Sequence, residues 1–369
     1  MLAPALIALA LAPAPRPPVL HVSPISDSPV TVSLVPRSHT ARIVCSVDHR
    51  RARTCPRKVR FKLRPGPHVV TAWAIARSGR AGRKVSAHFV VAAPAPRPVN
   101  IGGNPDGIAA LGATLWVSGG ASGAVVRVDA QTRQVTATIP VGGQLGGIAA
   151  TAQAIWISVF DGGTVGRIDP ATNAVVDRIA VGGQPTGIAV GADGSVWIGN
   201  LDGSVSRVDP SSDAVTARVA LPSGASALLP LGGLVWVGLQ SGSLVSLDPA
   251  TNALSGPAVN LSRDVDALTD TPNGLWVCTF DGTADRIDPS SRTAARRVKL
   301  PGRASGIAFA GGVVWVSLYD LRLVAELDSA TGALLGAVHT GAQPRDSVAA
   351  VGQVWVADQA SAQLTPIPG

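Results

Sequence analysis

The chain consists largely of short apolar runs separated by turn residues. Between residues 147 and 181 these runs are GIAA, AIWISV, GTVGRID and AVVDRIAV, and Gly, Asp, Pro and Asn stand between them. Runs of this length, rich in β-branched residues and bounded by turn residues, are typical of strands. No stretch keeps a 3.6-residue period for ten residues, so helical repeats are disfavoured. The pattern therefore predicts an all-β protein.

Tryptophan marks an internal repeat, because successive tryptophans lie 39 to 41 residues apart. A period near 40 with four short strands per unit is typical of β-propeller blades. Seven copies predict a seven-bladed β-propeller over residues 97–369. Each tryptophan stands between Val, Ile or Leu in the middle of a strand, which indicates a core position. The repeated residues are Trp116, Trp156, Trp197, Trp236, Trp276, Trp315 and Trp355.

The seventh copy, which begins at Ser347, supplies three strands before the sequence ends. Residues 97–109 (RPVNIGGNPDGIA) parallel residues 138–149 (TIPVGGQLGGIA), where the fourth strand of the first copy ends. We therefore expect residues 97–102 to supply the missing strand of the last blade. Such a pairing fastens the ring and removes an exposed strand edge.

A second domain is predicted over residues 20–92, where apolar alternations such as VTVSLV and ARIVCSV indicate a small β-sandwich. The Pro-rich residues 93–98 (APAPRP) form an extended linker. Residues 1–15 resemble a signal peptide with small residues near the cleavage point, although no Lys or Arg precedes the apolar run. A misassigned start or a membrane-retained leader are the alternatives. No other run of about 18 apolar residues occurs, so no transmembrane segment is expected in the mature chain.

The charge is divided unevenly along the chain. Residues 1–100 hold 16 Lys or Arg and two Asp, whereas residues 101–369 hold 15 Lys or Arg and 21 acidic residues. The four cations Lys58, Arg60, Lys62 and Arg64 alternate with apolar residues and should share one strand face. This face is either simply solvated or contacts a polyanion such as an envelope polymer, acidic lipid or nucleic acid. Export favours an envelope polymer, so no specific nucleic acid is expected.

Three cysteines fit an oxidising compartment. Cys45 and Cys55 lie ten residues apart in the small basic domain, where a disulfide would reinforce a thin core. A metal site that uses both cysteines and His49 is the alternative, but no second cysteine pair completes it. Cys278 lies in the apolar run LWVCTF and is interpreted as a buried free thiol.

Two resemblances follow from these segments. The stretch from Ala41 to Gly82, with Cys45, Cys55 and His68, resembles a bacterial Ig-like module, and this resemblance implies a Cys45–Cys55 bridge. Repeats such as GTVGRIDPATNAVV resemble the YVTN-type propeller repeat and the fold of the virginiamycin B lyase family. That family implies Mg²⁺ with His and Glu acting on a macrocyclic lactone. The propeller region holds only His339 and Glu326, so it departs from the family's pattern.

Charged residues start several innermost strands. Because the first and last blades are neighbours in a ring, Asp106, Arg345 and Asp346 should meet at the closure seam, and Asp266 starts another inner strand. This cluster is either a partly exposed ion pair or a polar patch that orients a ligand. On the same face, Phe160, Phe280 and Tyr319 follow the second strands, and they either pack against neighbouring blades or line a shallow site for an apolar or sugar-like ligand.

Two further residue types recur. An Asp follows the third strand in six of the seven copies, for example in DPAT at 169 and DPSS at 209, and it is expected to form the turn rather than bind metal. Arginines such as Arg127 and Arg167 stand two residues before this Asp and are expected to pair with carboxylates across strands.

The sequence contains no P-loop, no dinucleotide fingerprint, no H-E-x-x-H and no Ser-His-Asp arrangement. We therefore expect a monomeric, secreted or envelope-associated, non-enzymatic protein with no cofactor, no metal and no catalytic residue. Its propeller would bind a ligand or protein partner, and its basic module would dock to an anionic envelope polymer. The alternative is a metal-dependent lactone lyase or hydrolase in which Asp106, Asp264 and Asp266 act as metal ligands or bases.

Overall fold

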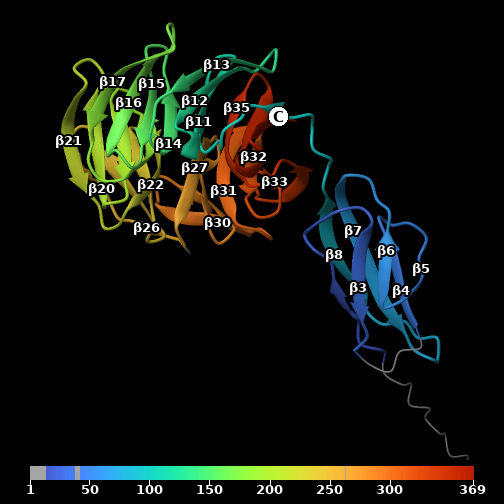
Figure 1. Ribbon diagram of the computed structural model, residues 1–369. Helices are drawn as coiled ribbons and strands as arrows, with labels where there is room; N and C mark the ends of the chain where they lie inside the picture. The colour runs from blue at the N-terminus through green and yellow to red at the C-terminus, as the bar shows by residue number, and fades with distance from the viewer. Residues whose placement is uncertain (1–13, 38–41, 262) are drawn as a thin grey trace, which may run out of the picture. The chain divides into compact units, whose positions relative to one another are not determined.

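The computed structural model describes residues 14–37, 42–261 and 263–369, and these residues form strands with only two short 3-10 turns, Gly120–Ser122 and Gln359–Ser361 (Figure 1). The chain divides into two compact units between Ala92 and Ala93. The expected signal peptide, residues 1–15, lies outside the described residues except for its last two. Within the described ranges, no helix is long and apolar enough to cross a membrane.

Unit 1 contains two sheets that share one core. Val32 and Leu34 from one sheet pack with Val70 and Phe89 from the other, and all four are buried. The strand VTVSLV alternates buried and accessible residues as its sequence indicates. One sheet has the order β1 (Val19–His21), β3 (Val30–Val35), β6 (Lys58–Phe61). The other has the order β2 (Ile25–Ser26), β8 (Val85–Val91), β7 (Gly66–Ile75), β4 (Arg42–Val47), β5 (Arg53–Cys55).

The predicted disulfide is confirmed. Cys45 and Cys55 are bonded, with 5.8 Å between their Cα atoms, and they join the neighbouring strands β4 and β5. Neither sulfur is therefore free to bind a metal together with His49. Cys278 is a buried free cysteine, as expected.

Removal of the disulfide should destabilise unit 1 selectively. The bond closes a loop with a sequence separation of 10, and the chain-entropy relation gives about 3 kcal/mol for a loop of this size. We expect the Cys45→Ala/Cys55→Ala variant to lower the unfolding transition of unit 1 in calorimetry and to leave the transition of unit 2 unchanged. Equal transitions in the variant and the wild type would contradict this expectation.

The basic strand of unit 1 is shorter than its alternation predicts. Strand β6 ends at Phe61, and the backbone N–H of Leu63 donates to the Ser28 hydroxyl at 3.0 Å instead of continuing a ladder. Lys62 and Arg64 therefore follow the strand, although both stay exposed and Leu63 between them stays buried.

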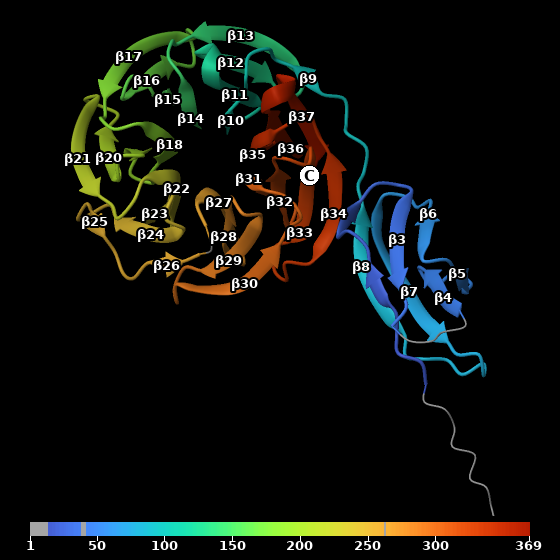
Figure 2. The ribbon, with the colours of Figure 1, turned by 60° about the horizontal axis from the view of Figure 1, so that its bottom comes forward.

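Unit 2 consists of repeated antiparallel sheets of four strands, arranged around a common centre as in a propeller (Figure 2). The first strands contact one another in a closed circle, since β10 touches both β14 and β35. In order, the first strands are β10 (Ile108–Leu111), β14 (Leu145–Ala150), β18 (Pro185–Val190), β22 (Ala225–Leu231), β27 (Val265–Thr271), β31 (Ala304–Ala310) and β35 (Pro344–Ala350).

The second strands carry the repeated tryptophans, all of which are 4% exposed or less. The second strands are β11 (Thr114–Gly119), β15 (Ile155–Val159), β19 (Val196–Asn200), β23 (Leu234–Leu239), β28 (Gly274–Thr279), β32 (Val313–Leu318) and β36 (Gln353–Asp358). The third strands are β12 (Ala124–Asp129), β16 (Thr164–Asp169), β20 (Ser204–Asp209), β24 (Ser243–Asp248), β29 (Thr283–Asp288), β33 (Leu323–Asp328) and β37 (Gln363–Pro368).

The fourth strands lie at the outside of the ring. They are β13 (Gln134–Pro140), β17 (Ala174–Ala180), β21 (Ala214–Ala220), β25 (Ala253–Leu254) with β26 (Val259–Asn260), β30 (Thr293–Lys299), β34 (Leu334–His339) and β9 (Val99–Asn100). Strand β9 completes the sheet that contains the end of the chain, because Val99 pairs with Leu364 and Asn100 with Gln363 of β37. Ala93, at the start of the Pro-rich segment, forms a parallel bridge with Val338 of β34.

The recurring arginines connect neighbouring sheets. Arg167 stacks over Trp156 at 5.7 Å, and its guanidinium pairs with Asp213 in the turn of the next sheet at 2.6 Å. Arg127 likewise covers Trp116 and donates to Asn173 of the following sheet. The prediction of carboxylate partners therefore holds for Arg167 and for Arg207, which pairs with Asp193, whereas Arg127 and Arg286 donate to amide or backbone oxygens in the turn of the next sheet.

The turn Asp residues have the predicted role. The Asp129 carboxylate accepts the backbone N–H groups of Gln131 and Thr132 at 2.9 and 2.8 Å, and the aspartates after later strands repeat this arrangement. Two hydrogen bonds to the ionised form favour that form. The backbone hydrogen bond from Thr132 accordingly lowers the pKa of Asp129.

Candidate functional site

A candidate site in unit 2 is a cavity of about 550 Å³ at the centre of the ring, on the side where the first strands begin. We call it the mouth cavity. Its wall includes residues at the start of the first strands and residues in the connections after the second strands. The charged and aromatic residues that line it are Asp106, Phe160, Asp264, Asp266, Phe280, Arg345 and Asp346.

Arg345 is the centre of the charged cluster. Its Nε lies 3.2 Å from an Asp106 carboxylate oxygen, and its Nη1 lies 3.5 Å from an Asp266 oxygen. The Gln359 side-chain amide also donates to Asp106 at 3.1 Å. One guanidinium therefore joins a carboxylate just before β10 to a carboxylate of β27. The sequence predicts the Asp106–Arg345 proximity, and the structure adds Asp266, which belongs to a sheet that is not adjacent to β35.

Asp346 faces the closure seam. Its Oδ2 accepts the Ile108 backbone N–H at 3.1 Å, and its Oδ1 accepts the Ser347 N–H at 2.8 Å. The hydrogen bond from Ile108 therefore connects β35 to the backbone of β10. Arg345, in contrast, contacts only side chains in the pairs named above.

Burial shifts the pKa values of this cluster. Burial raises the pKa of Asp266 to about 6, against the opposing effect of Arg345. The pKa of Asp346 also rises to about 6, again through burial, which outweighs its two backbone hydrogen bonds. Burial alone would lower the pKa of Arg345, but the carboxylates of Asp266 and Asp106 outweigh it and raise that pKa. Arg345 is thus always charged, while Asp266 and Asp346 change their protonation in a physiological range.

The aromatic residues do not form one continuous surface. Phe160 and Phe280 line the mouth cavity, and Phe280 is 44% exposed. Tyr319 is not among the lining residues, and its hydroxyl is 3.3 Å from the Gln359 side-chain oxygen. The Arg303 guanidinium lies 4.9 Å from both the Phe280 and the Tyr319 ring centres, so a cation already covers both rings.

A belt of hydroxyl groups surrounds the centre of the ring, and sequence reasoning missed it. Each hydroxyl donates to a backbone carbonyl of the next sheet's inner strand or of the residue just before it, as Ser118 does to Gly146 and Ser158 to Thr186, both at 2.7 Å. Thr186, Ser226 and Ser305 make the same kind of bond. For Ser118 and Ser158 the signal in the sequence is a Ser two residues after Trp, a place that Cys278 occupies in its own repeat. Thr186, Ser226 and Ser305 lie instead in first strands. Burial raises the pKa of the Cys278 thiol.

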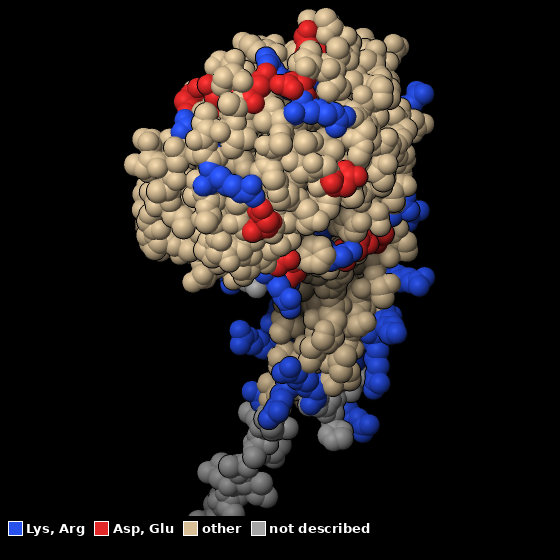
Figure 3. Space-filling model, turned by 60° about the vertical axis from the view of Figure 1, so that its left-hand side comes forward, with Lys and Arg blue, Asp and Glu red and all other residues tan. Residues whose placement is uncertain are grey.

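The basic residues of unit 1 form a second candidate surface. Lys58 and Arg60 lie on the exposed face of β6, and Lys62 and Arg64 are exposed after it. Lys and Arg predominate on unit 1 in Figure 3, whereas unit 2 carries both signs of charge. None of these four residues forms a salt bridge with a described residue.

Comparisons with known proteins support the fold of the chain. No family model matches the sequence, and no curated protein matches it. Among solved structures, a chain of Kuenenia stuttgartiensis hydrazine synthase aligns with a TM-score of 0.66 and 18% identity, over 72% of this chain and 96% of that chain. The match supports the propeller-like, all-β fold. In total 1403 chains of solved structures match, so the likeness does not select a function.

Proposed function

We propose that this protein is an exported binding protein, made of a seven-bladed YVTN-type propeller and a basic Ig-like module. The 40-residue repeat, the closed circle of first strands and the pairing of β9 with β37 support the propeller. The two sheets and the disulfide of unit 1 are compatible with an Ig-like module. A disulfide is also typical of proteins that work outside the cytoplasm, which agrees with export.

The mouth cavity is the proposed ligand site, and its charge balance is the observation that carries the proposal. Asp106, Asp264, Asp266 and Asp346 line it, against the single cation Arg345. A concave site with an excess of one charge favours a ligand of opposite charge. Phe160 adds an apolar wall. We therefore expect a small ligand, or an exposed segment of a protein partner, that carries an amine or another cationic group.

The test compares two aspartates of the same strand. Asp266 lines the mouth cavity, whereas Asp270 at the other end of β27 is exposed. We expect putrescine, spermidine or choline to raise the thermal unfolding temperature of the wild type and of Asp270→Asn, because a ligand of the native state adds stability. Asp266→Asn should abolish this shift. The proposal fails if no cation produces a shift or if both variants respond equally.

For unit 1 we propose docking to an anionic envelope polymer through Lys58, Arg60, Lys62 and Arg64. Binding that rests on exposed charges weakens as salt rises. We expect Arg60→Gln/Lys62→Gln to weaken binding of the full chain to an anionic polymer and to reduce its salt dependence. The matched control is Arg77→Gln/Arg83→Gln, which removes the same charge elsewhere in unit 1. Unchanged binding by the first variant would remove this half of the proposal.

A lactone lyase or hydrolase is the second candidate, and one observation favours it. Asp266 and Asp346 have pKa values raised to about 6, which gives the mouth cavity groups suited to proton transfer near neutral pH. Its metal-dependent form does not fit the residues, because Arg345 lies between Asp106 and Asp266. Among the described residues, no three His, Cys, Asp or Glu side chains are grouped to hold a metal. A thermal shift with Mg²⁺ or Ca²⁺ that EDTA reverses would contradict this reading of the residues and restore the metal-dependent form.

A further inference from the structure

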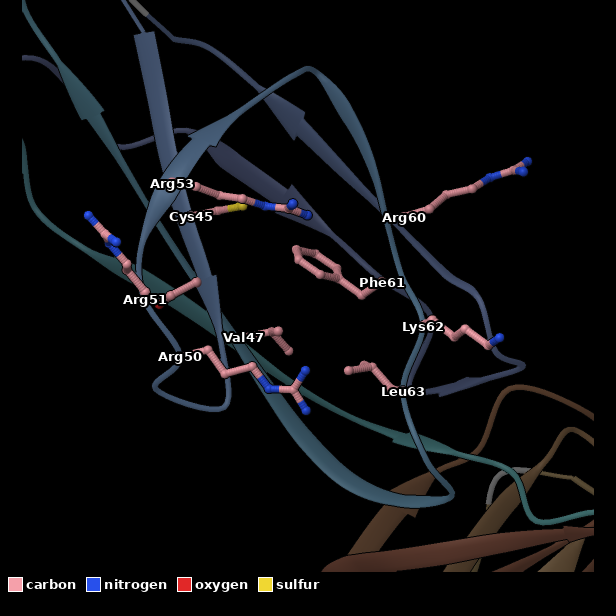
Figure 4. Close-up of a pocket in the computed structure, with 10 residues that line it drawn as sticks. Cys45, Val47, Arg50, Arg51, Arg53, Arg60, Phe61, Lys62 and Leu63 are labelled. Atoms are coloured by element: carbon pink, nitrogen blue, oxygen red, sulfur yellow. The ribbon is translucent and has the colours of Figure 1, made fainter.

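A second pocket, in unit 1, has a basic rim and an apolar floor. It has a volume of about 350 Å³ and lies between the β4–β5 hairpin and the β6 segment. We call it the hairpin pocket. Figure 4 shows that Val47, Phe61 and Leu63 point into it from the two sides. Its lining residues are Cys45, Ser46, Val47, Arg50, Arg51, Arg53, Arg60, Phe61, Lys62 and Leu63.

The hairpin that carries the arginines is held in place at both ends. Asp48 and His49 have φ values of 48° and 56°, and the Arg50 N–H donates to the Val47 carbonyl, which closes a tight turn. The Asp48 carboxylate accepts the Val69 N–H at 3.1 Å and contacts His68 Nδ1 at 2.8 Å. The disulfide fixes the other end at Cys55. Arg50 and Arg53 therefore lie on a backbone segment that is fixed at both ends.

Two of the arginines extend into the pocket from opposite ends. In Figure 4 the guanidinium groups of Arg50 and Arg53 extend toward the space between the strands, whereas Arg60 and Lys62 point away from it. The Arg53 guanidinium lies 5.6 Å from the centre of the Phe61 ring. A guanidinium placed on an aromatic face keeps its N–H groups free at the edge for an anion.

The cations of this rim form no ion pair with the described residues. None of Arg50, Arg51, Arg53, Arg60 and Lys62 forms a salt bridge with a described residue. The nearby carboxylate is that of Asp48, which Arg50 influences without an ion pair and which already accepts two hydrogen bonds. Arginine forks match the oxygens of phosphate, and cations at this density are stabilised by an anion.

We propose that the hairpin pocket binds the phosphate group of an amphiphile, with the phosphate between Arg50 and Arg53 and the first apolar groups on Val47, Phe61 and Leu63. Phosphate rather than carboxylate is favoured because its three terminal oxygens point in different directions and can meet two separate forks, whereas the two oxygens of a carboxylate lie in one plane. The apolar floor favours a lipid-like phosphate over a free one. This inference rests on the proposal that unit 1 binds an anionic partner, and it adds a pocket with Arg50 and Arg53 beside the docking residues Arg60 and Lys62.

The test is calorimetric titration of the full chain with dihexanoyl phosphatidic acid below its micelle concentration. We expect this ligand to bind at least about tenfold more tightly than glycerol 3-phosphate, which lacks the chains, and than dihexanoyl phosphatidylcholine, which has no net charge. Arg50→Gln/Arg53→Gln should weaken binding by about tenfold or more. Both side chains are exposed, so circular dichroism should show an unchanged fold.

Two controls separate a pocket from diffuse charge. Arg50→Lys/Arg53→Lys keeps the charge and should still weaken binding, because it removes the forks. Arg77→Gln/Arg83→Gln removes two charges elsewhere in unit 1 and should leave the affinity within about twofold. Equal losses in the Gln pair and this control, or equal affinities for phosphatidic acid and glycerol 3-phosphate, overturn the inference.

The outcome also distinguishes this inference from the docking proposal. Arg50→Gln/Arg53→Gln can leave phosphatidic acid binding unchanged while Arg60→Gln/Lys62→Gln weakens polymer binding. This result would support the docking proposal and contradict amphiphile binding in the hairpin pocket. If neither variant changes the binding of either ligand, both proposals fall.

Discussion

Replacing Val99 by Asp will lower the free energy of unfolding of unit 2 by about 3 kcal/mol or more, since a buried carboxylate without a partner is costly. Val99 is 7% exposed and packs with Ile101, Trp355 and Leu364. It also belongs to β9, the strand that completes the last sheet. The substitution therefore damages the core at the point where the ring closes. Chemical denaturation of the full chain measures the loss.

The neighbouring residue supplies a control for this prediction. Asn100 lies in the same strand, pairs with Gln363 and is exposed. Asn100→Asp adds the same charge on the opposite face of the strand, and we expect a change below about 0.5 kcal/mol. Similar effects of the two substitutions would show that β9 does not contribute to the core.

The free energy of unfolding of unit 2 should fall as the pH rises from about 4 to about 6. Burial raises the pKa of Asp266, Asp346 and Asp358 from 3.8 to about 6 in the folded state. Between these values the unfolded chain has lost the proton and the folded chain still holds it, so each rise in pH favours unfolding. One such group accounts for about 3 kcal/mol. Above pH 6 both states are ionised and the effect is complete.

The turn aspartates change the free energy of unfolding in the opposite direction, and they do so at lower pH. Hydrogen bonds lower the pKa of Asp129, Asp169 and Asp209 below 3.8. Their contribution is lost as the pH falls below about 4, so stability should be greatest near pH 4. Urea denaturation from pH 3 to 8 measures the profile, and Asp358→Asn should make the fall between pH 4 and 6 smaller. A continuous rise of stability from pH 4 to 7 would contradict the prediction.

The repeated features of the fold could be read from the sequence because they are local. Trp between β-branched residues indicates a buried strand, and Asp followed two residues later by a free backbone N–H indicates a turn. Both signals recur with the same period, which makes each copy support the others. The end of strand β6 could not be predicted in this way. The alternation of buried and exposed residues continues through Leu63, although the strand's hydrogen bonding ends at Phe61.

The candidate sites depend on contacts between distant residues, and the sequence predicts them only in part. The meeting of Asp106 and Arg345 follows from ring closure, which brings the first and last copies together. The contact with Asp266 depends on the reach of one long side chain past the first strand of the intervening sheet, β31. The hydroxyl belt was not predicted because Ser and Thr are common residues. Their partners are backbone carbonyls, which every residue has, so the residue types do not identify them. The hairpin pocket could not be predicted from the sequence, because it depends on how the two sheets of unit 1 pack against each other.

The pairing of Val99 with Leu364 also has a consequence for the order of folding. These residues are separated by nearly the whole of unit 2, so their contact has a very high sequence separation, and such contacts form late. When the chain emerges from its N-terminal end, β9 is synthesised first in this unit and must wait for β37. Because the cost of closing a loop grows only with the logarithm of its length, the long delay adds little to the equilibrium cost. The ring is therefore slow to close, and until it closes β37 presents an open edge to other chains.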